Sequence, residues 1–308
     1  MKKTWKVLLC MALIMTMLLG SVAMAAMSPE EQAAKNDHHA IVGLEGLNNA
    51  RDLGGYVTAD GQSQIKSGLL LRTAKLADCT EGDIAVLQSY DIEKVIDLRM
   101  LPERLSKPDK KIPGADNIVI STQTIPNIFV ITGEDWLMML SAIKSGVMDT
   151  YMTGMYRQLI SDPVAIKGTQ KFFQQLIEAN GEPVLWHCTS GKDRTGIEAY
   201  LLLCALGVSE EVARAEYLNT NVFMEGKAQE NYDKAYKYTH SKWIASEFFK
   251  HEGVSESWLD VALKVVARYG GVDAYLRDVI KLTDEDFAAL RDIYLEPAAA
   301  TLAYAPAA

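Results

Sequence analysis

The protein has 308 residues, of which 49% are hydrophobic and 23% are charged, and its formal net charge at pH 7 is −9. This composition is typical of a globular protein and excludes collagen-like, wholly disordered and polytopic membrane proteins. The excess of acidic residues argues against general nucleic-acid binding, which depends on a basic surface. Four cysteines in a chain of this length are too few for a disulfide scaffold.

Residues 1–25 have the three parts of a secretory signal peptide. Three lysines lie before the apolar stretch 7–19, which is too short to cross a bilayer as a helix. Ala23-Met24-Ala25 then supplies the small residues of a cleavage site. We therefore expect cleavage after Ala25 and export to the periplasm or out of the cell. An uncleaved membrane anchor is the alternative.

The remainder of the chain is expected to form a single domain over residues 41–295. Residues 26–40 are polar and lack periodicity, which predicts a flexible lead-in, and the Ala/Pro-rich residues 296–308 predict a flexible tail. Removal of the signal peptide would leave three cysteines, Cys79, Cys188 and Cys204. Because this number is odd, at least one thiol has no partner within the chain, and a disulfide between Cys79 and Cys204 is left open.

Strand and helix patterns alternate along the domain. Short apolar or β-branched runs predict strands at 69–71, 94–98, 118–120 and 184–186. Helical patterns cover 81–90, 134–160, 168–180, 194–205 and nearly all of 209–295. Candidate capping residues begin or end several of these helices: Thr80, Asn180-Gly181, Ser209, Ser255 and Thr283. The alternation predicts an α/β fold with a central sheet and a large helical C-terminal part.

Two helical stretches, 125–160 and 221–265, are longer than a minimal α/β core needs and are rich in methionine and aromatic residues. One interpretation is ordinary helix packing. The other is a lid or specificity wall around a pocket.

The segment from Val184 to Gly196 combines a buried strand, a short loop and the start of a helix. Its strand leads into His187 and Cys188, and five residues separate Cys188 from Arg194. A loop that opens a helix directs backbone N–H groups and the positive end of the helix dipole toward a bound anion. We therefore expect a site for a tetrahedral dianion. Its candidate binding residues are Thr189, Ser190, Gly191, Lys192, Asp193 and Arg194.

This arrangement also predicts a reactive cysteine. The loop N–H groups would stabilise Cys188 as a thiolate nucleophile, and the planar guanidinium of Arg194 can bind two anion oxygens. Thr195 can donate a hydrogen bond to the thiolate, and His187 is expected to orient the loop rather than act as a base. The alternative is that Cys188 is only a small buried hydrophobic residue.

Residues 187–196, His-Cys-Thr-Ser-Gly-Lys-Asp-Arg-Thr-Gly, resemble the HCxxGKDRTG signature of the bacterial tyrosine phosphatase family that includes secreted mycobacterial and Listeria enzymes. Three further segments resemble motifs of that family in the same order. They are NARDLGGY at 49–56, GLLLRTA at 68–74, and VIDLR at 95–99 with PER at 102–104. The resemblance extends from about residue 41 to residue 215.

The resemblance implies a Cys-phosphatase fold, with a central, mainly parallel sheet flanked by helices, helical lid insertions and a helical C-terminal part. It also implies phosphomonoester hydrolysis through a cysteinyl-phosphate intermediate, without metal or cofactor. Asp193 would be the general acid, since no Trp-Pro-Asp motif is present, and Lys192 would add positive charge near the substrate. Asp97 could be a supporting carboxylate, and Arg51 or Asp52 could brace the loop, although each could equally be structural.

The predicted substrate is a phosphotyrosine protein, with phosphoserine, phosphothreonine and phosphoinositides as further candidates. A phosphoinositide or inositol-polyphosphate phosphatase is the main alternative, and a catalytically silent phosphate-binding module is a weaker one. The sequence indicates no nucleic-acid partner and leaves the oligomeric state open.

Overall fold

The computed structural model describes residues 39–124 and 136–298. The expected signal peptide, most of the expected lead-in and most of the expected tail lie outside these ranges. The helices and strands described below belong to the compact unit that begins at Ile41. No helix in the described ranges is both long and apolar enough to cross a membrane.

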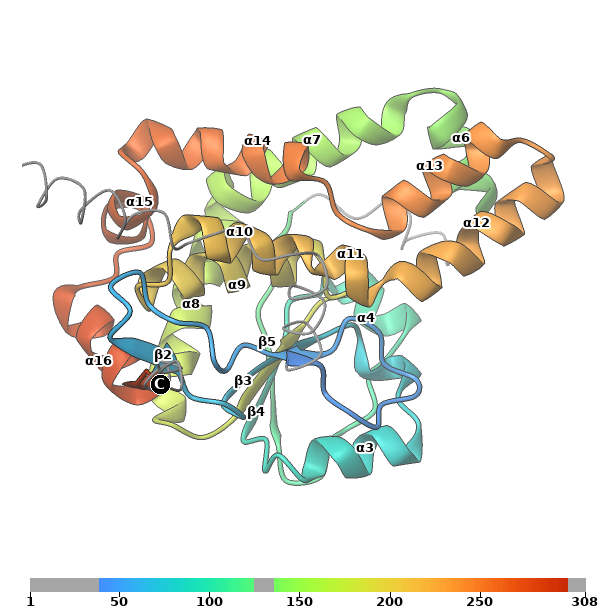
Figure 1. The fold of residues 1–308 in the computed structure, drawn as a ribbon. Coiled ribbons are helices and arrows are strands. Elements are labelled where there is room, and N and C mark those ends of the chain that lie inside the picture. The colour runs from blue at the N-terminus through green and yellow to red at the C-terminus, as the bar shows by residue number, and fades with distance from the viewer. Residues whose placement is uncertain (1–38, 125–135, 299–308) are drawn as a thin grey trace, which may run out of the picture. The chain divides into compact units, whose positions relative to one another are not determined.

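A five-stranded sheet of order β1-β3-β6-β4-β5 forms the centre of the unit (Figure 1). Its strands are β1 (Arg51–Asp52), β3 (Leu70–Thr73), β4 (Lys94–Asp97), β5 (Asp116–Val119) and β6 (Val184–His187). Only β1 runs antiparallel to its neighbour, so the sheet is mainly parallel, as predicted. The register aligns His187 with Thr73 on one side and Asp97 on the other. The carboxyl ends of three strands therefore meet at one edge, where open α/β sheets bind ligands.

Helices cover both faces of this sheet. They are α3 (Glu81–Gln88), α4 (Leu101–Ser106), α8 (Pro163–Ala179), α9 (Asp193–Ala205), α10 (Glu210–Leu218) and α16 (Asp284–Tyr294), with short helices η1 (Leu76–Asp78), α11 (Thr220–Phe223) and α15 (Val272–Asp278) between them. Successive strand side chains point to opposite faces. Leu71 and Leu185 pack with α3, whereas Leu70 and Trp186 pack in the larger core with α8 and α9. The two faces thus form two separate hydrophobic cores.

A further helical layer lies above the carboxyl edge of the sheet (Figure 1). It contains α6 (Trp136–Lys144), α7 (Val147–Ser161), α12 (Glu225–Thr239), α13 (Lys242–Glu252) and α14 (Glu256–Val266), which η2 (Ala267–Tyr269) follows. Helices α12 and α13 pack as a hairpin, α7 packs on α14, and α6 contacts both α7 and α13. These helices correspond to the two long helical stretches of the sequence.

Most predicted helix ends are confirmed by capping hydrogen bonds. Thr80 and Thr283 each form a capping box, and the Ser209 side chain accepts a hydrogen bond from Val212. Asn180 ends α8 with a positive φ of 49°. Ser255 does lie just before α14, but its hydroxyl bonds Ser257 instead of capping the helix.

Three predicted boundaries differ in the structure. The stretch expected to be helical over 134–160 consists of two helices in its described part, because Gly146 adopts a left-handed φ of 71° before α7. Helix α8 begins at Pro163 rather than at residue 168, since Asp162 caps it and proline fits the first helical position. Residues 296 and 297, expected to open the tail, belong instead to β7 (Leu295–Pro297), which pairs with β2 (Ser63–Ile65).

Candidate active site

Cys188 lies at the carboxyl end of the central strand β6, in the loop before α9. Its side chain is buried, and it lines a cavity of about 350 Å³ together with Thr189, Ser190, Asp193 and Arg194. The sequence prediction of a strand, loop and helix with the cysteine at the strand end is therefore confirmed for the described chain. The arrangement places a thiol next to the N-terminus of a 13-residue helix.

The glycine in this loop is required by its surroundings. Gly191 has a φ of +64°, and a Cβ atom at this position would lie 2.3 Å from the carbonyl oxygen of Thr73. The loop is thus packed directly against the end of β3. A larger residue would displace the loop backbone.

Donors behind the loop hold its carbonyl groups outward. The side-chain amide of Asn49 donates to the carbonyls of Ser190 (3.1 Å) and Gly191 (2.8 Å), and Arg72 donates to Gly191 (2.7 Å). The backbone of Lys75 donates to the Thr189 carbonyl. These bonds satisfy the loop carbonyls and hold the loop backbone against the residues around β1 and β3.

One buried carboxylate organises the residues that brace the loop. Glu216 accepts from Arg51 Nε at 2.7 Å and from Arg72 Nη1 at 2.8 Å, and all three side chains are fully buried. Arg51 also donates to Asn49. Arg51 thus braces the loop indirectly, through Asn49 and through the Glu216 carboxylate that it shares with Arg72. Asp52 instead accepts hydrogen bonds from the backbones of Gly54 and Gly68 and connects two turns outside the loop.

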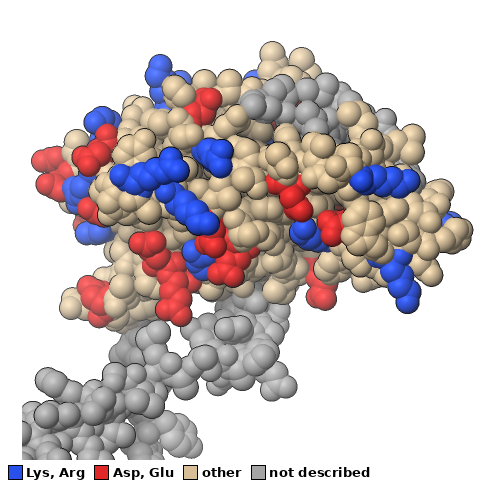
Figure 2. Space-filling view, turned by 90° about the horizontal axis from the view of Figure 1, so that it is seen from above, with Lys and Arg blue, Asp and Glu red and all other residues tan. Residues whose placement is uncertain are grey.

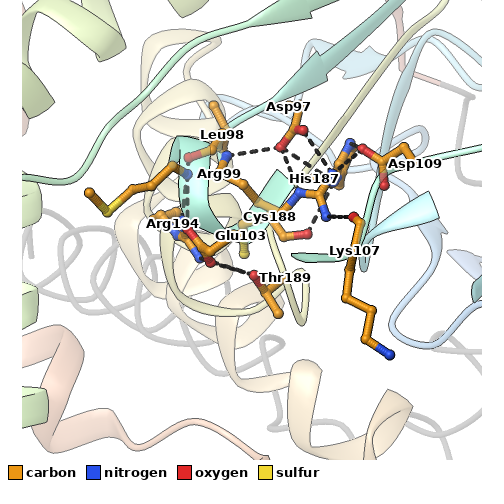
Figure 3. A network of polar contacts seen from close by, with 11 residues as sticks. Asp97, Leu98, Arg99, Glu103, Lys107, Asp109, His187, Cys188, Thr189 and Arg194 are labelled. Carbon is orange, nitrogen blue, oxygen red and sulfur yellow. Dashed lines mark hydrogen bonds and ion pairs between the residues drawn. The ribbon is translucent and has the colours of Figure 1, made fainter. Parts of the chain in front are cut away.

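Arg194 is held by a carboxylate from the segment after β4. Its Nη1 and Nη2 atoms each donate to a Glu103 oxygen at 2.6 Å, and Thr189 Oγ1 donates to the same carboxylate at 2.5 Å (Figure 3). Burial by itself would raise the pKa of Glu103, but the hydrogen bonds and charge of Arg194 lower it to about 2. This bidentate pair fixes the plane of the guanidinium beside Cys188.

A second polar network lies behind His187. Arg99 donates to both oxygens of Asp97 at 2.9 Å and also pairs with Asp109, while His187 Nε2 lies 3.3 Å from Asp109 (Figure 3). His187 Nδ1 lies 3.0 Å from the Cys188 carbonyl oxygen. His187 thus contacts both the loop backbone and this network. The network places Asp97 behind the loop as a partner of Arg99.

The same network contains donor atoms that a metal ion could use. Oxygens of Asp97 and Asp109 and a nitrogen of His187 lie within 4.8 Å of one another. However, the Arg99 guanidinium already pairs with both carboxylates, and this positive charge takes the place that a cation would fill. We therefore interpret the cluster as an ion-pair network.

Asp193 and Lys192 have different surroundings, although both line the cavity. Asp193 accepts a hydrogen bond of 2.7 Å from the hydroxyl of Tyr156. Lys192 Nζ donates to the carbonyls of His251 (2.5 Å) and Gly253 (3.0 Å) at the end of α13. Lys192 therefore anchors the helical layer to the loop, a role that the sequence prediction did not include.

The remaining candidates are a threonine and two cysteines. Thr195 Oγ1 is buried without a hydrogen-bond partner among the described residues, so the expected bond to Cys188 is not formed. The three cysteines of the described ranges are free, and burial raises the pKa of both Cys79 and Cys204 to about 12. These two residues are thus held as neutral thiols, while Cys188 lies in the cavity.

The helical layer forms the walls of the cavity. Met148, Met152 and Met155 of α7 line one side, and α12 and α13 contribute polar and apolar groups on another. These methionines are also buried in the main core. Both interpretations of the two long helical stretches therefore apply, because the helices pack as core elements and also enclose the cavity.

Sequence reasoning missed several residues that contact the loop. Asn49 and Glu103 lie within motifs that were recognised, but neither received a role. The position of Glu103 in the Pro-Glu-Arg segment was the available signal. No local pattern points to Glu216 or Tyr156, because each meets its partner from a separate helix.

The comparisons with known proteins agree with this site. The tyrosine phosphatase family model matches residues 42–296. A Cupriavidus necator protein assigned to the tyrosine-protein phosphatases is 30% identical over 280 residues, which cover 90% of this chain and 96% of that protein. The triple specificity protein phosphatase PtpB of Mycobacterium tuberculosis is 28% identical over 203 residues, covering 59% of this chain and 70% of that protein. A tyrosine-protein phosphatase of Nostoc commune is 27% identical over 245 residues, which cover 76% of this chain and 78% of that protein. The chain belongs to the tyrosine phosphatase family.

Proposed function

We propose that the protein hydrolyses phosphotyrosine through a cysteinyl-phosphate intermediate formed on Cys188. The observation that carries this proposal is the position of Cys188 at the cavity, beside a guanidinium fixed by Glu103 and at the start of α9. An anion-binding loop, a thiol and an adjacent carboxyl group are the parts that nucleophilic phosphoryl transfer needs.

The proposed reaction has two steps. Cys188 Sγ attacks phosphorus and the bond to the leaving oxygen breaks, while Asp193 donates its proton to that oxygen. Water then attacks the phosphocysteine, Asp193 takes a proton from it, and Cys188 leaves as a thiolate. Arg194 and the loop N–H groups stabilise the charge on the phosphoryl oxygens in both steps.

The depth and lining of the cavity favour an aryl phosphate. Cys188 is 2% exposed, and the cavity that it lines is also lined by the side chains of Met152, Met155 and Tyr151. An apolar wall of this kind suits a phenyl ring between the phosphate and the substrate backbone. Phosphoserine and phosphothreonine, which are shorter, would reach the thiol less readily.

One observation favours phosphoinositides as a second substrate class. The cavity is lined by Lys75, Lys192, Lys227 and Lys234 as well as Arg194, although the chain as a whole carries a charge of −9. On the face of the helical layer in Figure 2, basic and acidic side chains are interspersed. Positive charge gathered around the cavity would suit a headgroup with several phosphates.

We also propose that the enzyme acts outside the cytoplasm. The support is the signal-peptide pattern of residues 1–25 with its cleavage signal at Ala23-Met24-Ala25. N-terminal sequencing of protein recovered from the periplasm and the medium tests this proposal. A mature chain that begins near Ala26 is expected, and full-length protein in the cytoplasm would overturn it.

The hydrolytic proposal is tested with purified mature protein in the presence of EDTA. Substrates are a phosphotyrosine peptide, a phosphoserine peptide, phosphoinositides and inositol hexakisphosphate. Phosphate release from the phosphotyrosine peptide is expected, with at least ~1,000-fold loss in Cys188→Ser and little change in the control Cys204→Ser. Equal activity in wild type and Cys188→Ser would exclude the mechanism. Phosphate binding without turnover would indicate a silent binding module.

A further inference from the structure

Two buried tyrosines connect the Asp193 carboxylate to the helical layer. The Tyr156 hydroxyl on α7 donates to Asp193 Oδ1 at 2.7 Å, and it lies 2.7 Å from the Tyr217 hydroxyl on α10. Tyr217 in turn is 3.4 Å from the Ser255 carbonyl oxygen before α14. Neither tyrosine has a part in the two proposed steps above.

The surrounding residues fix both rings. Tyr156 and Tyr217 are fully buried and meet edge to face, and Tyr156 also packs on Trp258 at 6.1 Å. A Cβ atom on Gly196 would lie 3.0 Å from the Tyr217 ring, so the glycine of the Thr-Gly pair allows this close approach. The phenols therefore have little freedom to rotate away from Asp193.

Both phenols remain hydrogen-bond donors at every working pH. Burial is the main cause that raises the pKa of Tyr156 and of Tyr217 well above 10, and the nearby charge of Asp193 adds to it. Because the one hydroxyl proton of Tyr156 goes to Asp193, Tyr217 donates in the 2.7 Å contact rather than to the more distant Ser255 carbonyl. The hydroxyls then point toward the carboxylate, and each bond polarises the next.

We propose that Tyr156, supported by Tyr217, is a positioning residue that directs Asp193 into the cavity and stabilises the carboxylate formed when Asp193 gives up its proton. This inference rests on the proposed role of Asp193 as general acid. With Oδ1 held by Tyr156, Oδ2 is the oxygen left to carry the proton that the leaving group takes. As the proton moves to that group, the growing negative charge on Asp193 strengthens the bond from Tyr156.

Other titratable groups near Asp193 come from α7, α9, α13 and the loop that holds Cys188. Tyr151 on α7 and Arg194 on α9 interact electrostatically with Asp193, and Cys188 and His251 line the same cavity. Burial raises the pKa of Tyr151 to about 12 and lowers that of His251 to about 4. Neither Tyr151 nor His251 therefore changes charge in an assay between about pH 5 and 9.

The test compares Tyr156→Phe, Tyr217→Phe and Asp193→Asn on aryl phosphates with good and poor leaving groups. Tyr294→Phe is the matched control, because its buried hydroxyl bonds the Leu176 carbonyl instead. We expect Tyr156→Phe to lose about 10-fold in kcat on the poorest leaving group and less than about 2-fold on the best. Tyr217→Phe should show a smaller loss of the same kind, and Tyr294→Phe none.

The pH profile gives a second readout that a purely structural role would not move. Tyr156→Phe removes a donor to the carboxylate that forms in the first step, so the alkaline limb of kcat/KM should move to higher pH in this variant and not in Tyr294→Phe. In an Asp193→Asn background, Tyr156→Phe should add less than about 2-fold, because the two changes remove the same function.

The outcomes separate this inference from the proposed function. If the wild-type protein released no phosphate from any of these substrates, the proposed function itself would be wrong. If Asp193→Asn shows no dependence on the leaving group, Asp193 is not the acid and the inference fails while Cys188 chemistry stands. If Asp193→Asn shows that dependence but Tyr156→Phe keeps the wild-type slope and alkaline limb, Tyr156 is only a packing residue.

Discussion

Glu103 binds both terminal nitrogens of Arg194 at 2.6 Å, so the guanidinium beside the nucleophile is aligned by a carboxylate 91 residues earlier in the chain. Thr189 of the loop donates to the same carboxylate. Nη1 also lies 3.5 Å from the Leu98 carbonyl oxygen, and Nη2 lies 3.4 Å from Thr189 Oγ1. The ion pair thus orients Arg194 and leaves its Nε–H as the donor that makes no hydrogen bond to another described residue.

Loss of the Glu103 charge should weaken anion binding more than it weakens the fold. In Glu103→Gln we expect kcat/KM to fall by about 10- to 100-fold and the inhibition constant for inorganic phosphate to rise, because Arg194 loses its fixed orientation. Steady-state kinetics with phosphate as inhibitor measure both values. Asp260→Asn, which breaks an exposed pair with Arg214, is the control and should change neither by more than about twofold.

Gly191 should tolerate substitution by alanine far less than another glycine with a similar backbone conformation. Gly61 has a φ of +72° with open space at its Cβ position, whereas a Cβ on Gly191 would clash with Thr73. Gly61→Ala should therefore cost about 1 kcal/mol of unfolding free energy and leave activity intact. Gly191→Ala should reduce kcat/KM by ~100-fold or more. Comparable activity in the two variants would contradict the packing argument.

Lys192 should control the end of α13 as well as the charge of the cavity. In Lys192→Met we expect faster limited proteolysis near Gly253 and a higher KM for every substrate, because three carbonyls lose their donor. Lys250→Met, on the exposed side of α13, is the control. A loss confined to phosphoinositides, with unchanged proteolysis, would instead assign Lys192 to the substrate alone.

Glu198 should make the fold less stable as the pH rises. Its side chain is fully buried, with Thr169 as the donor to Oε1 and no partner for Oε2 among the described residues, and burial raises its pKa to about 8. Between its ordinary value of 4.5 and about 8 the folded state binds more protons than the unfolded state, so stability falls as pH increases through this range.

The variant Glu198→Gln should remove this dependence. Each pH unit in that range costs the wild type up to about 1.4 kcal/mol of unfolding free energy, and the glutamine variant should show a flatter curve. Chemical denaturation at pH 5, 6, 7 and 8 measures the difference. Glu178→Gln, which changes an exposed carboxylate on α8, should leave the curve as in the wild type. Parallel curves for wild type and Glu198→Gln would overturn the prediction.

The sequence alone determined the elements whose signals are local. The run from Val184 to Trp186 predicted β6 because buried parallel strands are continuously apolar. Thr80 and Thr283 predicted helix starts because a capping hydroxyl acts within three residues. The strand, loop and helix around Cys188 and Arg194 were predicted for the same reason, since five intervening residues set the geometry of the loop.

The tertiary structure decided which distant residues complete the site. Glu103 reaches Arg194 because β4 lies beside β6 in the sheet, and Glu216 reaches Arg51 and Arg72 from α10. Tyr156 reaches Asp193 only because α7 packs over the start of α9. Sequence patterns report the conformation of neighbouring residues, whereas these contacts depend on how whole elements pack. The nucleophile was therefore visible in the sequence, but the residues that orient its partners were not.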